Sequence, residues 1–566
     1  MNDFWDLVRE NIIGREASIR TPFGERRVTY ADYTASGRGV RFIESYLARV
    51  LELYGNTHTE DDATGAITSH RLRLAEAAIK RLLGAGDCYK IIEDGTGATG
   101  AVHRLQQILG IYIPPAGKDM YRKLGERWFP AEGLSEFESF LMANRPLVFV
   151  GPYEHHSNEV SWRECFAEVV EIELDAEGLL DLGDLERKVS DPRFRERRKI
   201  GAFSAASNVT GLITPVYEVA RILHRHSALA FFDYAAIAPY APILLCHGED
   251  CFLDGIFFSP HKLLGGPGSS GILIIHEGVY RYDLPPTVGA GGTVEFVNAE
   301  EQKYSAEIEV REKPGTPGIL QILRAALALE LKERLGPRRI EEREAAMIRE
   351  AMERLAAHPA VQIIGNPDPA RRIAILSFNI RMGDSYLHPR FVTLLLNDLF
   401  GIQSRAGCSC AGPYGHRLLK IDGRKSLEFR EEILHGHVGV KPGWARVNFH
   451  FLMSDAEFDF LCRAILFVAE KGKYFLPQYE FQLSTGAWKH REFRQPEPGF
   501  GLEEALTGPL AAGPPPGIAR APTEQELFAG YLREADRLAR ELEPGFLLAQ
   551  LDTTERDLIP FVYCRR

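Results

Sequence analysis

The sequence has no apolar run that approaches membrane-spanning length. No secretory signal is expected, because the first ten residues, MNDFWDLVRE, contain neither a basic n-region nor an apolar h-region. Eight cysteines in 566 residues are too few for a disulfide scaffold, and none stand at Cys-x-x-Cys metal spacing. These absences predict a cytoplasmic protein with reduced thiols, no membrane partner and no metal site.

An excess of basic charge is also missing. The chain carries 67 Lys and Arg residues against 78 Asp and Glu residues, a formal net charge of −11. This balance argues against a general nucleic-acid binder or an anionic-membrane binder. The remaining composition, 45% hydrophobic and 26% charged, is that of an ordinary globular protein, and the length allows two to four domains.

Short apolar runs alternate with helical patterns through the first 330 residues. This alternation predicts an α/β fold with a large, mostly parallel sheet and helices on both faces. The expected strands are residues 89–92, 147–150, 167–174, 199–204, 228–233, 256–258 and 272–275. The expected helices between and around them include residues 40–53, 64–83, 101–108, 180–189 and 216–226.

The pattern changes near residue 330. Helices are expected at 319–335, 340–358, 390–399 and 455–471, and strands at 373–380 and 445–451. We therefore predict a smaller α+β domain after the large one. The expected division is a lead-in at 1–30, the large domain at 31–330, the small domain at 331–475 and a C-terminal extension at 476–566.

Two segments stand apart from this plan. Residues 111–145 contain Pro114-Pro115 and mixed charge, and we interpret them as an irregular inserted surface segment. The C-terminal extension combines a Pro/Gly-rich linker at 507–522 with an amphipathic helix at 522–542. The polar face of that helix is mixed in charge, which indicates a packing or dimer element and not a membrane binder.

Polar residues follow several of the expected strands. In a parallel sheet, ligands collect where the strands end at their carboxyl side. Lys262 lies at one such end, and a lysine that loses hydration there becomes a better nucleophile. The other clusters at strand ends are the GTGATG loop at 95–100, His155 with His156, Asn208, and Asp233.

These residue types match the needs of pyridoxal 5′-phosphate. That cofactor requires a lysine for a Schiff base, an anion cradle for its phosphate, a carboxylate at its ring nitrogen and a flat group over its ring. Lys262, the 95–100 loop, Asp233 and His155 supply them in that order. The sequence therefore predicts a pyridoxal phosphate site.

The motifs also resemble a known family. The segments FDYA at 232–235, FSPHKLLG at 258–265, EHHS at 154–157 and SNVTG at 207–211 look like successive motifs of class V aminotransferases, which have the fold-type I architecture. The branch most similar is that of cysteine desulfurases and selenocysteine lyases. The segment SRAGCSCA at 404–411 resembles the active-cysteine loop of the desulfurases and is also similar to the loop of molybdenum-cofactor sulfurases.

The resemblance implies a role for each matching residue at the cofactor. Lys262 would form the Schiff base and move the substrate α-proton, His155 would stack on the ring, Asp233 would pair with the ring nitrogen, and Asn208 would reach the ring hydroxyl. His156 is interpreted as a packed structural histidine. The residues implied for the phosphate are Ala98, Thr99, Ser259 and His261.

Four further residues are implied at the substrate side. Arg446 would hold the substrate carboxylate, a task suited to a bidentate guanidinium. Cys410 would accept sulfur, and His58, in the GNTHT segment at 55–59, would either line the site or stabilise its own turn. Thr316 would reach the phosphate of a neighbouring subunit, which predicts a homodimer with sites at its interface.

The predicted function is a pyridoxal phosphate-dependent cysteine desulfurase-like activity. A thiolate at Cys410 would attack the sulfur of L-cysteine and give alanine and a persulfide for an acceptor protein. Ala236 replaces the glutamine usual in the family, Gly100 replaces an acidic residue, and Cys408 adds a second thiol. The alternatives are an aminotransferase, lyase or epimerase acting on another amino acid, and a non-catalytic sulfur-transfer scaffold.

Overall fold

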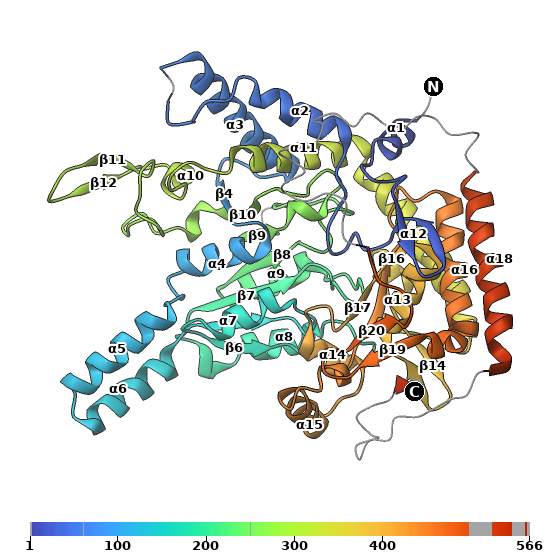
Figure 1. The fold of residues 1–566 in the computed structure, drawn as a ribbon. Helices are drawn as coiled ribbons and strands as arrows, with labels where there is room; N and C mark the ends of the chain where they lie inside the picture. The colour runs from blue at the N-terminus through green and yellow to red at the C-terminus, as the bar shows by residue number, and fades with distance from the viewer. Residues whose placement is uncertain (1–2, 60, 249–250, 497–522, 546–560, 563–566) are drawn as a thin grey trace.

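A seven-stranded sheet forms the centre of the larger domain (Figure 1). The computed structural model describes residues 3–59, 61–248, 251–496, 523–545 and 561–562. The order across the sheet is β4 (Tyr89–Asp94), β10 (Gly271–His276), β9 (Gly255–Phe258), β8 (Ala228–Asp233), β7 (Lys199–Ser204), β5 (Leu147–Val150) and β6 (Glu168–Glu171). The pairs from β9 to β6 are parallel, and only β10 runs antiparallel to its neighbours in this sheet. The predicted mostly parallel sheet is thus confirmed.

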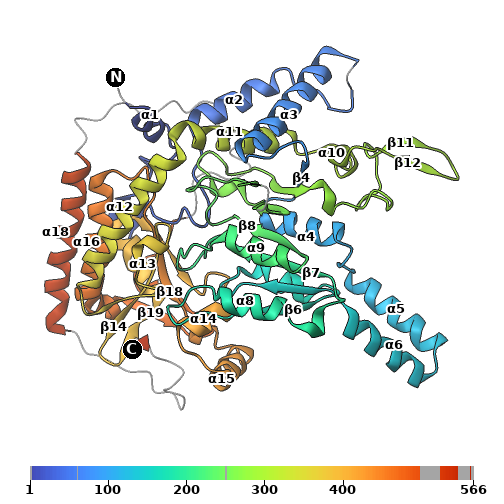
Figure 2. The ribbon, with the colours of Figure 1, turned by 180° about the vertical axis from the view of Figure 1, so that it is seen from behind.

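Both faces of this sheet are covered. In β10, Ile272 and Ile274 belong to one buried cluster while Leu273 and Ile275 belong to another, as expected where successive side chains point to opposite faces. Figure 2 shows helices over the strands on the face seen from behind. The helices of the first cluster include α2 (Arg41–Leu51), α3 (Ala63–Leu82), α8 (Leu182–Val189), α9 (Val216–Arg225) and α11 (Ile319–Leu335), and those of the second include α4 (Ala98–Ile108) and α7 (Val160–Arg163).

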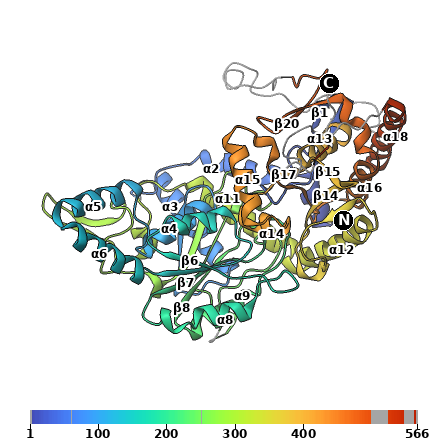
Figure 3. The ribbon, with the colours of Figure 1, turned by 90° about the horizontal axis from the view of Figure 1, so that it is seen from below.

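The inserted segment at 111–145 is not irregular, so this prediction was wrong. It forms a helical hairpin of α5 (Pro115–Trp128) and α6 (Ala131–Asn144), which projects from the large domain at the end opposite to the C-terminal helix (Figure 3). Neither helix contains a buried residue, and Pro115 occupies the first position of α5, where a helix tolerates proline. The expectation that the insert lies at the surface is confirmed.

The smaller domain is built on a mainly antiparallel sheet. Its strands, in order, are β17 (Arg405–Gly407), β18 (Trp444–Asn448), β14 (Ile375–Met382), β15 (Ser385–Leu387) and β21 (Phe561–Val562), with β13 (Val361–Ile363) beside β14. Helices α12 (Pro337–Ala356), α13 (Pro389–Phe400) and α16 (Asp455–Lys471) share its hydrophobic core. The predicted helix bounds at 319–335 and 455–471 coincide with those of α11 and α16.

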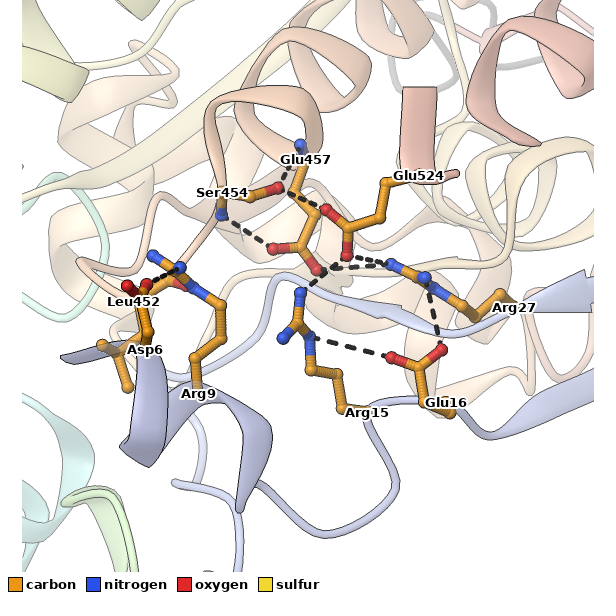
Figure 4. Close-up of polar contacts among 9 residues, drawn as sticks. All are labelled: Asp6, Arg9, Arg15, Glu16, Arg27, Leu452, Ser454, Glu457 and Glu524. Carbon is orange, nitrogen blue, oxygen red and sulfur yellow. Dashed lines mark hydrogen bonds and ion pairs between the residues drawn. The ribbon is translucent and has the colours of Figure 1, made fainter. Parts of the chain in front are cut away.

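The two ends of the described chain meet on this smaller domain. Helix α18 (Glu524–Leu542) packs on α16, and the Phe528 ring stacks on Phe460 with centroids 4.1 Å apart. In Figure 4 the Glu524 carboxylate accepts hydrogen bonds from Arg15, Arg27 and Ser454 at 2.6, 2.6 and 2.8 Å. The first helical turn of the C-terminal extension therefore holds the N-terminal segment against the small domain. The linker predicted at 507–522 lies outside the described residues.

The remaining elements are peripheral. No helix in the described ranges is long and apolar enough to cross a membrane. The N-terminal segment contributes β3 (Thr29–Tyr30), which pairs in parallel with β16 (Ile402–Gln403). The other peripheral elements are α1 (Phe4–Glu10), β1 (Ser18–Thr21), β2 (Gly24–Arg27), β11 (Val294–Val297), β12 (Gln302–Tyr304), α10 (Ile308–Arg311), α14 (Gly412–Leu418), α15 (Gly423–Leu434), β19 (Tyr479–Gln482) and β20 (Ala487–His490).

Candidate active site

A cavity of about 270 Å³ lies where the central strands end. It is lined by residues of the large domain and, from the small domain, by Arg405, Ser409 and Arg446. The structure brings nine of the predicted site residues together around it. These are Ala98, Thr99, His155, Asn208, Asp233, Ser259, His261, Lys262 and Arg446.

Lys262 follows β9 directly, in a short 3-10 turn that spans Pro260–Lys262. β9 is buried along its whole length, so a rigid element positions Lys262 at the carboxyl ends of the strands. Desolvation lowers the pKa of Lys262 to about 8, and the nearby Asp233 charge opposes that shift only in part. Near pH 8 a large fraction of the amine is neutral and able to attack a carbonyl.

Asp233 is the last residue of the neighbouring strand β8 and is 5% exposed. One of its oxygens accepts a hydrogen bond from the Ala235 amide at 2.8 Å. Burial raises the pKa of this carboxyl, while the Ala235 amide and the Lys262 charge act in the opposite direction. A buried carboxyl on the cavity wall would be well suited to pair with a heteroaromatic N–H.

The turn between β4 and α4 also lines the cavity, and it contacts the turn that contains Lys262. The amide of Ala98 donates to Ser259 Oγ at 2.8 Å, and Thr99 Oγ1 lies 2.7 Å from Ser157 Oγ. A Cβ at Gly97 would stand 2.9 Å from Ser259 Oγ, so a larger residue there would displace this hydroxyl. The first N–H groups of α4 have no partner inside the helix, and they lie at the positive end of the helix dipole. This arrangement favours the binding of an anion.

His155 is the residue placed to cover a bound ring. It lines the cavity, and its Nδ1 accepts a hydrogen bond from the Ser157 amide at 3.1 Å. Burial, reinforced by the Lys262 charge, lowers the pKa of His155 to about 3. The imidazole is therefore neutral at physiological pH and can stack without adding a positive charge beside the lysine.

Arg446 reaches the cavity from β18 of the small domain and is 2% exposed. Its Nη1 donates to the Asn208 carbonyl at 2.8 Å, and its Nη2 donates to Asp32 Oδ1 at 2.9 Å. Asp32 is therefore a site residue that the sequence analysis did not identify. Its only sequence signal is a carboxylate within the small-residue run ADYTASG at 31–37, and its partner is 414 residues away in the sequence.

Cys410 lies in the loop after β17. Its Sγ is 3.9 Å from Nη2 of Arg405, whose side chain lines the cavity, although Cys410 itself is not one of the lining residues described here. The neighbouring Ser409 lines the cavity, and its carbonyl accepts a hydrogen bond from Asn208 Nδ2 at 2.6 Å. The cysteine is half-buried at the edge of the cavity.

Two predicted residues lie elsewhere in this subunit. His58 Nε2 is 3.0 Å from the Gly315 carbonyl, and Thr316 Oγ1 accepts a hydrogen bond from Asn56 Nδ2 at 3.0 Å. In the described part of the chain neither lines the cavity that contains Lys262. They form one exposed contact between the turn before α3 and the turn before α11.

The cavity fits pyridoxal phosphate in size and in polarity. Its lining combines the N-terminal residues of α4 with Lys262, the buried Asp233 carboxyl and the neutral His155 ring. The hydroxyls of Thr34 and Ser409 are buried on the wall and have no hydrogen-bond partner among the described residues, so a bound polar group would satisfy them. No group of three or more His, Cys, Asp or Glu side chains suited to a metal ion occurs in the described ranges.

Comparisons with known proteins agree with this site. A model of the class V aminotransferase family matches residues 138–459, more than half of the chain. A probable cysteine desulfurase of Halalkalibacterium halodurans is 30% identical over 270 residues, and a cysteine desulfurase of Escherichia coli is 31% identical over 270 residues. Each match covers 47% of this chain and 62% of the relative, so the chain matches less than two thirds of these relatives' length.

Solved structures show the same fold. An apo cysteine desulfurase from Thermococcus onnurineus has a TM-score of 0.62 and 22% identity, with 82% of this chain and 98% of that chain covered. A cysteine desulfurase from Escherichia coli has a TM-score of 0.57 and 20% identity, with 83% and 99% covered. The architecture is therefore that of the fold-type I pyridoxal phosphate enzymes.

The chain belongs to the class V aminotransferase family. Enzymes of this family depend on pyridoxal phosphate, which agrees with the cofactor predicted from the sequence. The family resemblance based on the motifs at 154–157, 207–211, 232–235 and 258–265 is confirmed.

Proposed function

We propose that this protein is a cysteine desulfurase-like enzyme that removes sulfur from L-cysteine and leaves it as a persulfide on Cys410. One observation carries the proposal. Arg405 lines the cavity that contains Lys262 and also contacts Cys410 Sγ at 3.9 Å, so a thiol lies at the edge of the cofactor cavity. The relatives named as cysteine desulfurases support the same reaction.

The residues that would hold the cofactor are those of the cavity wall. Bound pyridoxal phosphate supplies an electron sink for bonds broken near the substrate α-carbon. Lys262 would bind it covalently, Asp233 would pair with its ring nitrogen and His155 would cover its ring. Asn208, at the cavity wall, would reach its ring hydroxyl. The phosphate would lie against Ala98, Thr99, Ser259 and His261.

The chain's own groups would then act in order. Arg446 would bind the substrate carboxylate with the N–H groups not used by Asp32 and Asn208. The Lys262 amine would take the α-proton, a task for which its lowered pKa suits it. The Cys410 thiolate would attack the substrate sulfur, so that an S–S bond forms and the carbon–sulfur bond breaks.

The overall reaction balances without an external oxidant. L-cysteine and one protein thiol give alanine and one protein persulfide, and the proton lost from sulfur replaces the sulfur on carbon. Arg405 would stabilise the thiolate by its charge at 3.9 Å. The persulfide would then pass to an acceptor thiol, which we expect on a separate protein.

We also propose that the active form is a homodimer in the cytoplasm. His58 and Thr316 contact each other's turns at an exposed edge away from the Lys262 cavity of their own subunit. This placement supports a site completed by a second copy, in which Thr316 reaches the partner's phosphate and His58 lines the partner's cavity. Mixed dimers of Lys262→Ala and Thr316→Val subunits should then regain about half of the activity per dimer, and no recovery would exclude the shared site.

The decisive experiment is a product profile with L-cysteine. Wild-type protein should release alanine, and sulfide with a reductant, in equal amounts, and Cys410→Ser should release neither while it retains the visible absorbance of the lysine-bound cofactor. Transfer of the amino group to a keto acid without alanine formation would favour an aminotransferase. Other products or altered stereochemistry would favour a lyase or an epimerase, and a lack of cofactor absorbance would favour a scaffold.

A further inference from the structure

The loop that contains Cys410 has a strained backbone. Ser409 and Cys410 have φ angles of 53° and 59°, so two consecutive residues with side chains adopt the left-handed conformation. This conformation is unfavourable for L-residues other than glycine and persists only where the surroundings impose it. Within the loop, the Ala411 amide donates to the Cys408 carbonyl at 3.1 Å. Groups outside the loop must supply the rest of the constraint.

His156 supplies two of the contacts that do so. Its backbone N–H donates to the Cys410 carbonyl at 2.8 Å, and its ring Nε2 accepts the Gly412 N–H at 2.9 Å. One residue of the large domain therefore bonds to the loop on both sides of Ala411, the residue after Cys410. A Cβ at Gly412 would lie 3.2 Å from Nε2, so a larger residue would push the loop and the ring apart by a few tenths of an ångström.

His156 Nε2 accepts the hydrogen bond from Gly412 only while this nitrogen carries no proton. Burial lowers the pKa of His156, and the positive charge of Arg163 acts in the same direction. The neutral tautomer with its proton on Nδ1 is thus the form that fits the Gly412 amide. The ring is held as an acceptor under ordinary conditions.

The residue before His156 covers the cofactor cavity. His155 lines the cavity while His156 faces the loop, so the same short turn contacts both parts of the site. We propose that His156 is a positioning residue that holds the Cys410 loop at the edge of the Lys262 cavity. Its effect on sulfur transfer rests on the proposed desulfurase function, whereas its anchoring of the loop does not.

Two variants of equal side-chain length test this role. In His156→Gln the amide oxygen replaces Nε2 as an acceptor, and in His156→Met only a weakly accepting thioether sulfur remains. Both keep the backbone N–H bond to Cys410. His156→Leu serves as the variant without an acceptor. The control is His358→Met, which removes a similar bond from the Ala360 amide to a histidine ring at 3.2 Å, away from the cavity.

Three measurements are made on the holoenzyme. Hydrogen exchange of the peptide that contains Gly412 reports loop anchoring, persulfide on Cys410 after L-cysteine reports sulfur transfer, and α-proton exchange of L-alanine reports the Lys262 side of the site. For His156→Met and His156→Leu we expect about tenfold faster amide exchange and about tenfold slower persulfide formation, with α-proton exchange within about twofold of wild type. His156→Gln should stay within about threefold of wild type, and His358→Met should match wild type.

Other results would overturn the inference. Unchanged Gly412 exchange in both His156→Met and His156→Leu would show that the ring does not anchor the loop. Faster exchange with normal persulfide formation would show that the anchor does not position Cys410. If wild-type protein forms no persulfide, the proposed function fails, and the exchange data still decide whether His156 anchors the loop.

Discussion

The two reactive side chains of the proposed site are held in different ways. Lys262 follows a strand that lies in the middle of the large sheet and is fully buried. Cys410 follows the three-residue strand β17 at the edge of the smaller sheet. Its loop is fixed by bonds from His156 and Asn208, which belong to the other domain.

This difference separates two parts of the chemistry. Backbone pairing along several strands positions Lys262. Single side-chain changes around it should therefore alter the chemistry without moving the lysine. The Cys410 loop depends on a few contacts across the domain boundary, so it should be the part that single changes displace. Sulfur transfer should therefore be lost more easily than cofactor binding and α-proton exchange.

The largest effect on activity is expected when Lys262 itself is replaced. Lys262→Ala should abolish the visible absorbance of the bound cofactor and lower kcat by at least about 10³-fold, because both the covalent link and the proton carrier are lost. Absorbance spectra and alanine release measure this. Lys332→Met, which changes another buried lysine, should retain the absorbance. Persistent turnover in Lys262→Ala would show that another group moves the proton.

Replacement of Cys410 should have a large effect that is confined to sulfur transfer. Cys410→Ser should lower sulfide release by at least about 10²-fold while cofactor absorbance and α-proton exchange of L-alanine stay within about twofold. The exposed Cys246→Ser is the matched control and should behave as wild type. Sulfide release at the wild-type rate in Cys410→Ser would move the acceptor role to Cys408 or to an external thiol.

Substrate binding joins the two regions through Arg446. Asp32→Asn removes the charge that holds Nη2 of Arg446 at 2.9 Å. We expect KM for L-cysteine to rise about tenfold with kcat within about threefold, because the buried guanidinium loses its orienting partner. Asp6→Asn, which weakens the more exposed pair with Arg9, should leave KM unchanged. A fall in kcat alone would argue that Asp32 does not act through substrate binding.

The last prediction concerns the pH dependence of the reaction between the Lys262 amine and the cofactor. Because the pKa of Lys262 is lowered to about 8, its amine is protonated below that pH and neutral above it. The rate of pyridoxal phosphate uptake by apoenzyme should therefore rise with pH, by about tenfold between pH 7 and pH 9. Stopped-flow absorbance measures this rate, and Cys410→Ser should give the same profile. A flat profile would contradict the shifted lysine.

Most of the large domain could be predicted from the sequence. The strands around Phe257 are continuous apolar runs, and glycine or polar residues end them, so their position follows from local pattern alone. The hairpin of α5 and α6 could not be predicted in this way. Pro114-Pro115 and the mixed charge indicated an irregular segment, but Pro115 is the first residue of α5, where proline does not break a helix.

The candidate site shows the same division. Each residue at a strand end, such as Asp233 or Lys262, could be named because a parallel sheet gathers its carboxyl ends at one edge. The pairing of Arg446 with Asp32 spans 414 residues, and that of His156 with Gly412 spans 256. His156 was interpreted as a packed structural histidine, and nothing in its local sequence indicates the loop that it contacts.

The sequence by itself therefore determined the order of most strands and helices, most of the predicted residues that line the Lys262 cavity, and the family to which the chain belongs. Only the tertiary structure decided which side chains hold Arg446 and the Cys410 loop, and that His58 and Thr316 lie apart from the cavity of their own subunit. The physical reason is the range of the interactions. Strand and helix patterns arise from neighbours along the chain, whereas these contacts form only after the two domains have packed together.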